Sequence, residues 1–76
     1  MENLLERIKR NPKIMFGKPI IKNTRITVEL VLEKLGYGAS EKEVLESYPF
    51  LTHEDIQACI LYASRVVSME EFLDAA

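Results

Sequence analysis

The sequence contains few of the residues from which catalytic and metal sites are built. Its 76 residues include one cysteine, Cys59, which excludes an internal disulfide and fits a reducing compartment. The one histidine, His53, falls in an acid-rich first turn of a helix, where we expect a solvent-exposed residue rather than a general base. Zinc sites need three or four clustered ligands, and the Cys and His spacing supplies none. We therefore expect no enzyme, no metal and no cofactor.

Long apolar runs are also absent. No run approaches the roughly 20 residues that cross a bilayer. The N-terminal segment MENLLERIKRNPK carries too much charge for a signal peptide. We expect a soluble, cytoplasmic protein with no membrane contact. The length allows one domain, residues 1–76, and the hydrophobic content of 47% supplies a compact core and excludes a disordered chain.

Acidic residues are scarce at one end of the chain. Residues 1–25 hold two acids and seven cations, a balance of +5, whereas residues 26–76 have a balance of −7. The seven cations are Arg7, Lys9, Arg10, Lys13, Lys18, Lys22 and Arg25. This asymmetry indicates two surfaces of opposite charge, with a chance imbalance as the alternative.

Local signals predict where the first two helices begin and end. Thr27 is an N-cap ahead of a helical stripe of apolar residues, and Gly36-Tyr37-Gly38 ends that helix. Ser40 with Glu43 is a capping box for a second helix, which Pro49 stops. Ahead of them, Leu4, Leu5 and Ile8 suggest a turn of helix. Ile14-Met15-Phe16 and Ile20-Ile21, on either side of Gly17-Lys18-Pro19, look like short strands or a tight turn.

A third helix follows Thr52, which with Asp55 forms a near-capping box. Cys59 lies on its apolar stripe and is expected to be a small core side chain. Ser68 with Glu71 predicts a separate, amphipathic tail helix. The fold is thus predicted to be mainly α, with a helix-turn-helix core of three helices joined by short turns. Its parts are a basic, β-like N-terminal segment (1–26), the core (27–67) and the tail helix (68–76).

The stretch GKPIIKNTRIT, residues 17–27, enters the first predicted helix with cations and no acid. A turn at Asn23, which tolerates positive φ, can bring Lys18, Lys22 and Arg25 beside the helix N-terminus, where phosphate is favoured. The hydroxyl of Thr24 can bind phosphate oxygens or the backbone. Two interpretations remain equal on these residues: a connector with cations in water, or a corner that contacts phosphate.

The third helix is the expected recognition helix. Its outward side is predicted to hold Glu54, Gln57, Ala58, Leu61 and Arg65. Gln57 and Arg65 are residue types that read bases, whereas Glu54 and Asp55 would repel phosphates. An exposed Leu61 suits a protein partner or a dimer contact better than DNA.

An ordered set of motifs resembles the domain of unknown function 433 (DUF433) family from about Asn11 to Ala63. They are Gly17-x-Pro19-x-Ile21-Lys22-x-Thr24-Arg25-Ile26-x-Val28, Gly38-x-Ser40, Tyr48-Pro49-x-Leu51-Thr52, Asp55-Ile56-x-Ala58 and Tyr62-Ala63. The family usually has Gly before the Thr-Arg pair, where this chain has Asn23. The departure is mild because both residues accept a left-handed backbone.

The resemblance implies a homeodomain-like or winged-helix-like fold and a VapB-like antitoxin of a type II toxin–antitoxin pair. Its implied partners are operator DNA, bound from a homodimer, and a toxin that is a PIN-like ribonuclease. On this hypothesis the basic segment faces DNA and the acidic C-terminal part covers the toxin. Phe72 and Leu73 then anchor in a groove while Glu70 and Glu71 meet cations.

Alternatively, Phe72 and Leu73 pack on this chain's own core. A second functional hypothesis is a protein-interaction module or dimer without DNA binding, which the acidic third helix and the sequence pI of about 5.4 favour.

Overall fold

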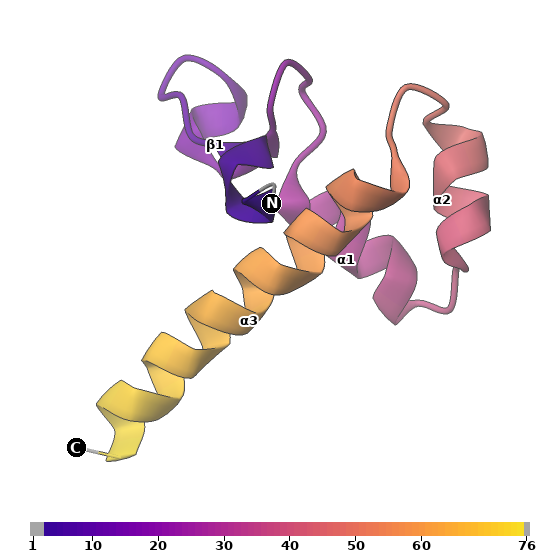
Figure 1. Cartoon of the computed structure of the whole chain (residues 1–76). Helices are drawn as coiled ribbons and strands as arrows, with labels where there is room; N and C mark the ends of the chain where they lie inside the picture. Colours follow the sequence, from indigo (N-terminus) through magenta and orange to yellow (C-terminus); the bar gives the residue numbers. More distant parts are fainter. Residues whose placement is uncertain (1–2, 76) are drawn as a thin grey trace.

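Within residues 3–75, which the computed structural model describes, the chain forms three α-helices and a small antiparallel sheet (Figure 1). The described side chains are those of residues 3–69. The helices are α1 (Val28–Gly36), α2 (Glu41–Ser47) and α3 (His53–Ala75). The sheet pairs β1 (Ile8–Lys9) with β2 (Ile20–Ile21), and two single turns, η1 (Leu4–Arg7) and η2 (Met15–Gly17), accompany it. The prediction of a mainly helical fold is confirmed.

The caps of α1 explain its boundaries. The Thr27 hydroxyl oxygen accepts a hydrogen bond from the Leu30 N–H at 3.0 Å, which satisfies one of the unpaired amides of the first turn. At the other end Gly38 adopts φ 101°, and the amide of Ala39 reaches back to the carbonyl of Lys34 at 3.0 Å. That left-handed glycine and the return bond form a Schellman motif, which closes the helix as predicted.

Helices α2 and α3 begin at the predicted capping boxes. The Ser40 hydroxyl accepts from the Glu43 N–H, and the Glu43 carboxylate accepts from the Ser40 N–H. At α3 the Asp55 carboxylate accepts from the Thr52 N–H at 2.9 Å, and the Thr52 hydroxyl accepts the longer return bond. Each box satisfies two amides reciprocally, so both starts are specified by residues three positions apart.

Helix α3 does not stop where the sequence suggested. It runs through Ser68 without interruption from His53 to Ala75 (Figure 1). The prediction of a separate tail helix at residues 68–76 is therefore wrong. A Ser–Glu pair forms a capping box only when the residue before it leaves the helix. No Gly or Pro lies between His53 and Ala75 to cause that break. The division between 27–67 and 68–76 therefore marks no structural boundary.

The N-terminal segment is more irregular than predicted. Leu4 and Leu5 form a single 3-10 turn, and Ile8 instead opens β1, opposite Ile21 of β2. Ile20 also bridges to Thr27, which places β2 between β1 and the entry to α1. The first apolar run, Ile14 to Phe16, becomes a turn and forms no strand.

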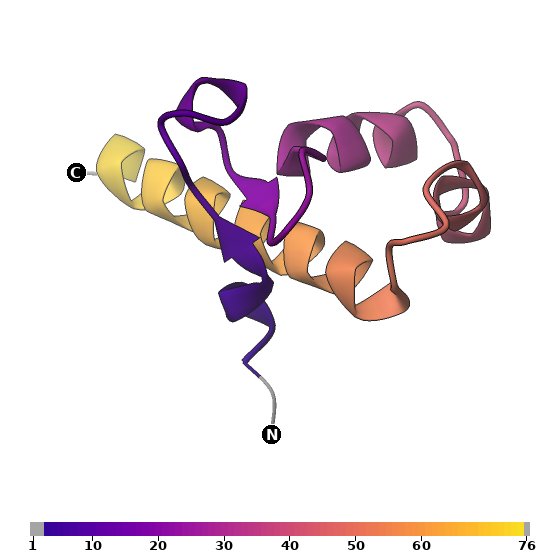
Figure 2. The same cartoon turned by 90° about the horizontal axis from the view of Figure 1, so that it is seen from above.

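The core joins this small sheet to all three helices. Ile8 and Ile21 from the sheet pack with Val31 of α1, Val44 of α2 and Ile56 of α3. Seen from above, η1 and β1 lie across α3 (Figure 2). The N-terminal half of α3 packs in the core, and its C-terminal half projects beyond the rest of the domain (Figure 1).

Candidate nucleic-acid interface

The turn between β2 and α1 is built by its own polar residues. Asn23 adopts φ 66°, as its tolerance of positive φ predicted. The Thr24 hydroxyl donates to the Ile21 carbonyl at 2.7 Å and accepts from the Ile26 N–H at 3.0 Å. Its proton and one lone pair are thus engaged in the turn. Thr24 therefore shapes the corner. A hydrogen bond to a phosphate oxygen would need the hydroxyl proton, which Thr24 already donates to the Ile21 carbonyl.

The corner forms one side of a basic groove, which we define by Lys9, Ile14, Lys22, Arg25, Ile26 and Phe50. Lys9 comes from β1, Lys22 and Arg25 from the turn, and Phe50 from the connection between α2 and α3. Phe50 is 61% exposed although it is aromatic. The groove therefore combines three cations with apolar side chains and has no acid in its lining. That combination suits a chain of phosphates with flat bases.

Lys18 does not belong to this groove. Its ammonium contacts the Glu29 carboxylate of α1 at 2.8 Å, and both side chains are exposed. The hydrogen bond to Glu29 and the charge of that residue raise the pKa of Lys18. The alternative pair between Arg25 and Glu29 is absent among the described residues. Of the cations predicted for the corner, the structure brings together Lys22 and Arg25, and Lys18 lies apart from them.

Two amides at the N-terminus of α1, where the sequence suggested that phosphate is favoured, are already paired inside the fold. The Val28 amide donates to the Pro19 carbonyl at 3.0 Å, and the Leu30 amide donates to Thr27. Thr27 itself is buried. These two amides are therefore engaged, whereas the cationic side chains of Lys22 and Arg25 are exposed.

Asp55 is an acid at the start of α3 whose charge is shielded from solvent. Its Oδ1 atom accepts from the Arg7 guanidinium at 2.9 Å, while Oδ2 accepts from the Thr52 amide. The Asp55 side chain is only 10% exposed. A nearby hollow is lined by Arg7, Lys22 and Asp55 among others, so this ion pair lies close to the corner. The predicted repulsion between Asp55 and phosphate is therefore offset by Arg7.

The recognition-helix residues lie elsewhere. Gln57 and Arg65 are exposed on α3, as predicted, but neither lines the basic groove. They are eight positions apart, which is about 12 Å along a helix axis. Ala58 was expected on the outward side and is instead fully buried, because it faces the core one turn from Asp55. Leu61 is half-buried.

A second surface lies between α1 and the distal half of α3. We define this apolar groove by Val28, Leu32, Tyr62, Val66 and Val67; Glu29 and Glu33 also line it. Val66 and Val67 are 43% and 49% exposed. The backbone of the predicted partner-binding residues Glu70, Glu71, Phe72 and Leu73 continues α3, and their side chains lie outside the described residues.

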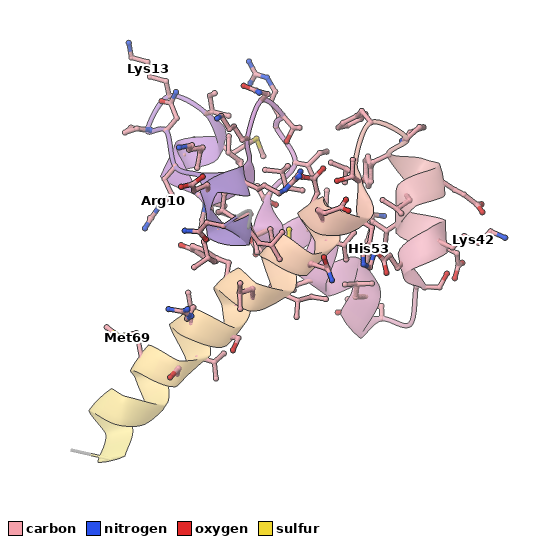
Figure 3. The ribbon with its side chains drawn as sticks, in the orientation of Figure 1. Arg10, Lys13, Lys42, His53 and Met69 are labelled. Atoms are coloured by element: carbon pink, nitrogen blue, oxygen red, sulfur yellow. The ribbon has the colours of Figure 1, made fainter. Side chains whose placement is uncertain are left out.

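Cys59 and His53 lie in surroundings typical of residues that support the fold. Cys59 is fully buried, and burial, with a smaller effect of the Asp55 charge, raises the pKa of its thiol to about 12. His53 is exposed and contacts the Glu41 carboxylate of α2 through Nδ1 (Figure 3). Among the described residues, no group of three or more His, Cys, Asp or Glu could hold a metal ion. No described helix has the length and apolar character to cross a membrane.

Sequence reasoning missed Lys9 and Phe50. Lys9 joins the groove only because β1 pairs with β2, in the register that sets Lys9 opposite Ile20. That pairing is non-local, and its signal in the sequence is a two-residue apolar stretch. Phe50 had a local signal: it follows Pro49 in a short connection, where a large apolar residue has little core to enter.

The fold and its surfaces define a small, mainly helical domain with a basic groove on its N-terminal side and an apolar groove along α3. The family model DUF433, "Protein of unknown function", matches residues 8–63. The chain belongs to this family, which confirms the resemblance drawn from its motifs. The chain is also similar to the crystal structure of a DUF433 member protein from Anabaena variabilis ATCC 29413. The TM-score is 0.78 at 33% sequence identity, over 92% of this chain and 69% of that chain. No curated protein matches the chain.

Proposed function

We propose that this protein is a VapB-like antitoxin that binds operator DNA through the basic groove and a PIN-like ribonuclease toxin through α3. The observation that carries the proposal is the separation of two unlike surfaces on one small domain. One is cationic, without an acid in its lining; the other is apolar, with acids along its edge. An antitoxin that represses its own operon needs both surfaces at once. In this proposal the cationic surface binds the operator DNA and the apolar surface binds the toxin.

The DNA half of the proposal is supported by the three cations of the basic groove. Lys9, Lys22 and Arg25 are all exposed and come from two separate segments of the fold. Neutralising phosphates with such side chains releases counterions, which is the main source of affinity for DNA. We assign α2 and α3 to a helix-turn-helix, with Gln57 and Arg65 available for base edges. A homodimer would present two such surfaces to a symmetric operator.

The protein half is supported by the projecting part of α3. A helix of 23 residues is about 34 Å long, and its distal half leaves Val66, Val67 and Met69 exposed. An amphipathic helix that lays its apolar side into a groove is a common recognition mode. Glu33 at the edge of the apolar groove favours a cationic partner. The other predicted partner-binding residues, Leu61 and residues 70–73, belong to the same helix.

A protein-interaction module that lacks DNA binding is the second candidate. The net charge of −2 and the acids Glu41, Glu43 and Glu46 on α2 favour it, because α2 would approach the DNA backbone in a helix-turn-helix. On this alternative the cations of the basic groove face water.

Separation-of-function variants test the proposal in cells that express the proposed PIN-like ribonuclease toxin. Val66→Asp/Val67→Asp should lose growth rescue and, in the purified protein, keep its binding to operator DNA. Lys22→Ala/Arg25→Ala should keep growth rescue and lose repression of a reporter driven by the upstream DNA. All four positions are exposed, so circular dichroism should show unchanged folding. Loss of both functions in either variant, or of neither, contradicts the assignment of the two surfaces.

A truncation tests the terminal part of α3. Deleting residues 69–76 should abolish neutralisation of the ribonuclease while DNA binding survives. Growth rescue by the truncated protein would show that the toxin surface lies elsewhere. A fall in the melting temperature of the truncated protein would instead support packing of Phe72 and Leu73 on the core.

A further inference from the structure

Phe16 is the most exposed large apolar side chain among the described residues, at 96%. It lies in the middle of η2, where Met15, Phe16 and Gly17 have φ values of 48°, 58° and 78°. Left-handed backbone of this kind is ordinary for Gly and unfavourable for a bulky residue such as Phe. The fold therefore places an aromatic ring in water on a strained turn, and the ring contributes nothing to the core.

The turn is held firmly from within its own segment. The Gly17 amide donates to the Ile14 carbonyl at 3.1 Å, and the Ile14 amide donates to the Asn11 carbonyl at 2.9 Å. The Arg10 side chain donates through Nε to the Gly17 carbonyl at 3.0 Å. These bonds fix the backbone on both sides of Phe16. Strain retained in such a supported turn is characteristic of positions that serve binding.

The charge around the turn indicates the kind of partner. Between Glu6 and Glu29 the sequence contains no acid, and Arg10 and Lys13 extend from the ribbon on either side of the loop before η2 (Figure 3). Ile14, two residues from Phe16, lines the basic groove, so the turn continues that surface. An exposed ring with cations around it matches a polyanion that also offers flat apolar faces. A nucleic acid offers both in every nucleotide, a phosphate and a flat base face.

We propose that Phe16 contacts base faces at a step of the duplex whose phosphates bind the basic groove. This inference rests on the DNA-binding half of the proposed function and adds a residue to it. The ring enters the stack as an apolar wedge, and the cations of residues 10–13 hold the neighbouring phosphates. The fixed turn avoids the entropy loss of ordering a flexible loop on binding.

Fluorescence of a single introduced tryptophan tests the contact, because the chain has no Trp. Phe16→Trp should bind duplex DNA from upstream of the gene and lose emission as the indole stacks on bases. Tyr37→Trp is the matched control, since Tyr37 is 87% exposed on the connection after α1 and outside the basic groove. Its emission should not change. Equal responses of the two variants, or a response of Phe16→Trp only to the ribonuclease, would overturn the inference.

Affinity separates this role from a structural one. Phe16→Ala should weaken DNA binding on the order of tenfold, as loss of an aromatic–base contact does, with Tyr37→Ala unchanged. Phe16→Gly should raise the melting temperature by relieving the left-handed strain and still bind DNA weakly. If the wild type binds DNA and Phe16→Ala binds it with the same affinity, the role of Phe16 is refuted and the proposed function still stands. Absence of wild-type binding at low salt would refute both.

Discussion

Asp55 joins three parts of the chain through one carboxylate. It caps α3 through the Thr52 amide and pairs with Arg7, which ends the η1 turn. Arg7 and Asp55 are 48 positions apart, so their pairing fastens the N-terminal segment to the last helix. The same pair removes a negative charge from the side of the molecule on which Lys22 lies. One residue thus serves both stability and the electrostatics of the candidate interface.

Arg7→Ala should test this at the level of stability. Removing the guanidinium leaves a nearly buried carboxylate without that partner, so the free energy of unfolding should fall by about 2 kcal/mol. Lys42→Ala, on the exposed face of α2 (Figure 3), is the control and should leave it unchanged within about 0.5 kcal/mol. Urea denaturation of both variants measures the difference. Equal stabilities would mean that the ion pair does not hold the N-terminal segment.

Glu43 makes the cap of α2 depend on pH. The Ser40 amide, and then the Ser40 hydroxyl, lower the pKa of Glu43 below its ordinary value of 4.5. A carboxyl group with a lowered folded-state pKa stabilises the fold above its unfolded pKa, and this contribution is lost as the pH falls through the folded pKa. Glu43→Gln keeps an acceptor without the charge. It should melt below the wild type at pH 7, and the gap should close below pH 4.5. A gap that does not change with pH would contradict this.

At the scale of elements, the caps could be predicted from sequence and the pairings could not. Thr27, Ser40 and Thr52 act on residues three positions away, so their signals are complete within a short window. The pairing of Ile8 with Ile21 depends on a loop closing between them. The continuation of α3 through Ser68 depends on whether the residues before Ser68 remain helical. A capping motif alone does not reveal this.

The candidate site divides in the same way. Lys22 and Arg25 flank one local turn and could be assigned to a common corner from sequence. Lys18 lies only four residues from Lys22, yet it pairs with Glu29 and does not line the basic groove. Lys9 could be assigned to the basic groove only from the register of β1 and β2. The exposed position of Phe16 could be found only from the backbone conformation, since nothing in its residue type indicates a left-handed turn.

Thr27→Ala should destabilise the element that follows the corner. The lost acceptor leaves the Leu30 amide unpaired at the start of α1, at a cost of about 1 to 2 kcal/mol. Thr27→Ser keeps the hydroxyl and should recover most of that loss. Thermal melting of the two variants measures the effect. If Ala and Ser behave alike, the methyl group of this buried residue, rather than its hydroxyl, carries its contribution.

At the scale of the whole molecule, the charge asymmetry of the sequence becomes a division of surfaces. The cations Lys9, Lys22 and Arg25 lie at the basic groove, whereas Arg7 and Lys18 pair with acids. Acids lie along α1 and α2, and the apolar groove follows α3. Asp55, at the start of α3, adds little exposed charge because it is nearly buried and pairs with Arg7. The overall charge of −2 therefore describes neither surface, and it does not oppose a local approach of DNA.

The most direct test of this account is the salt dependence of binding to upstream duplex DNA, measured by fluorescence anisotropy. Each phosphate contact contributes about 0.9 to the slope of log affinity against log salt concentration. Lys22→Ala/Arg25→Ala should therefore lower the slope by about two for each bound protomer and weaken binding. Lys18→Ala/Lys34→Ala removes the same charge outside the basic groove and outside α2 and α3, and should change neither. If the two double variants have the same slope, or the wild type does not bind at low salt, the basic groove is not a DNA interface.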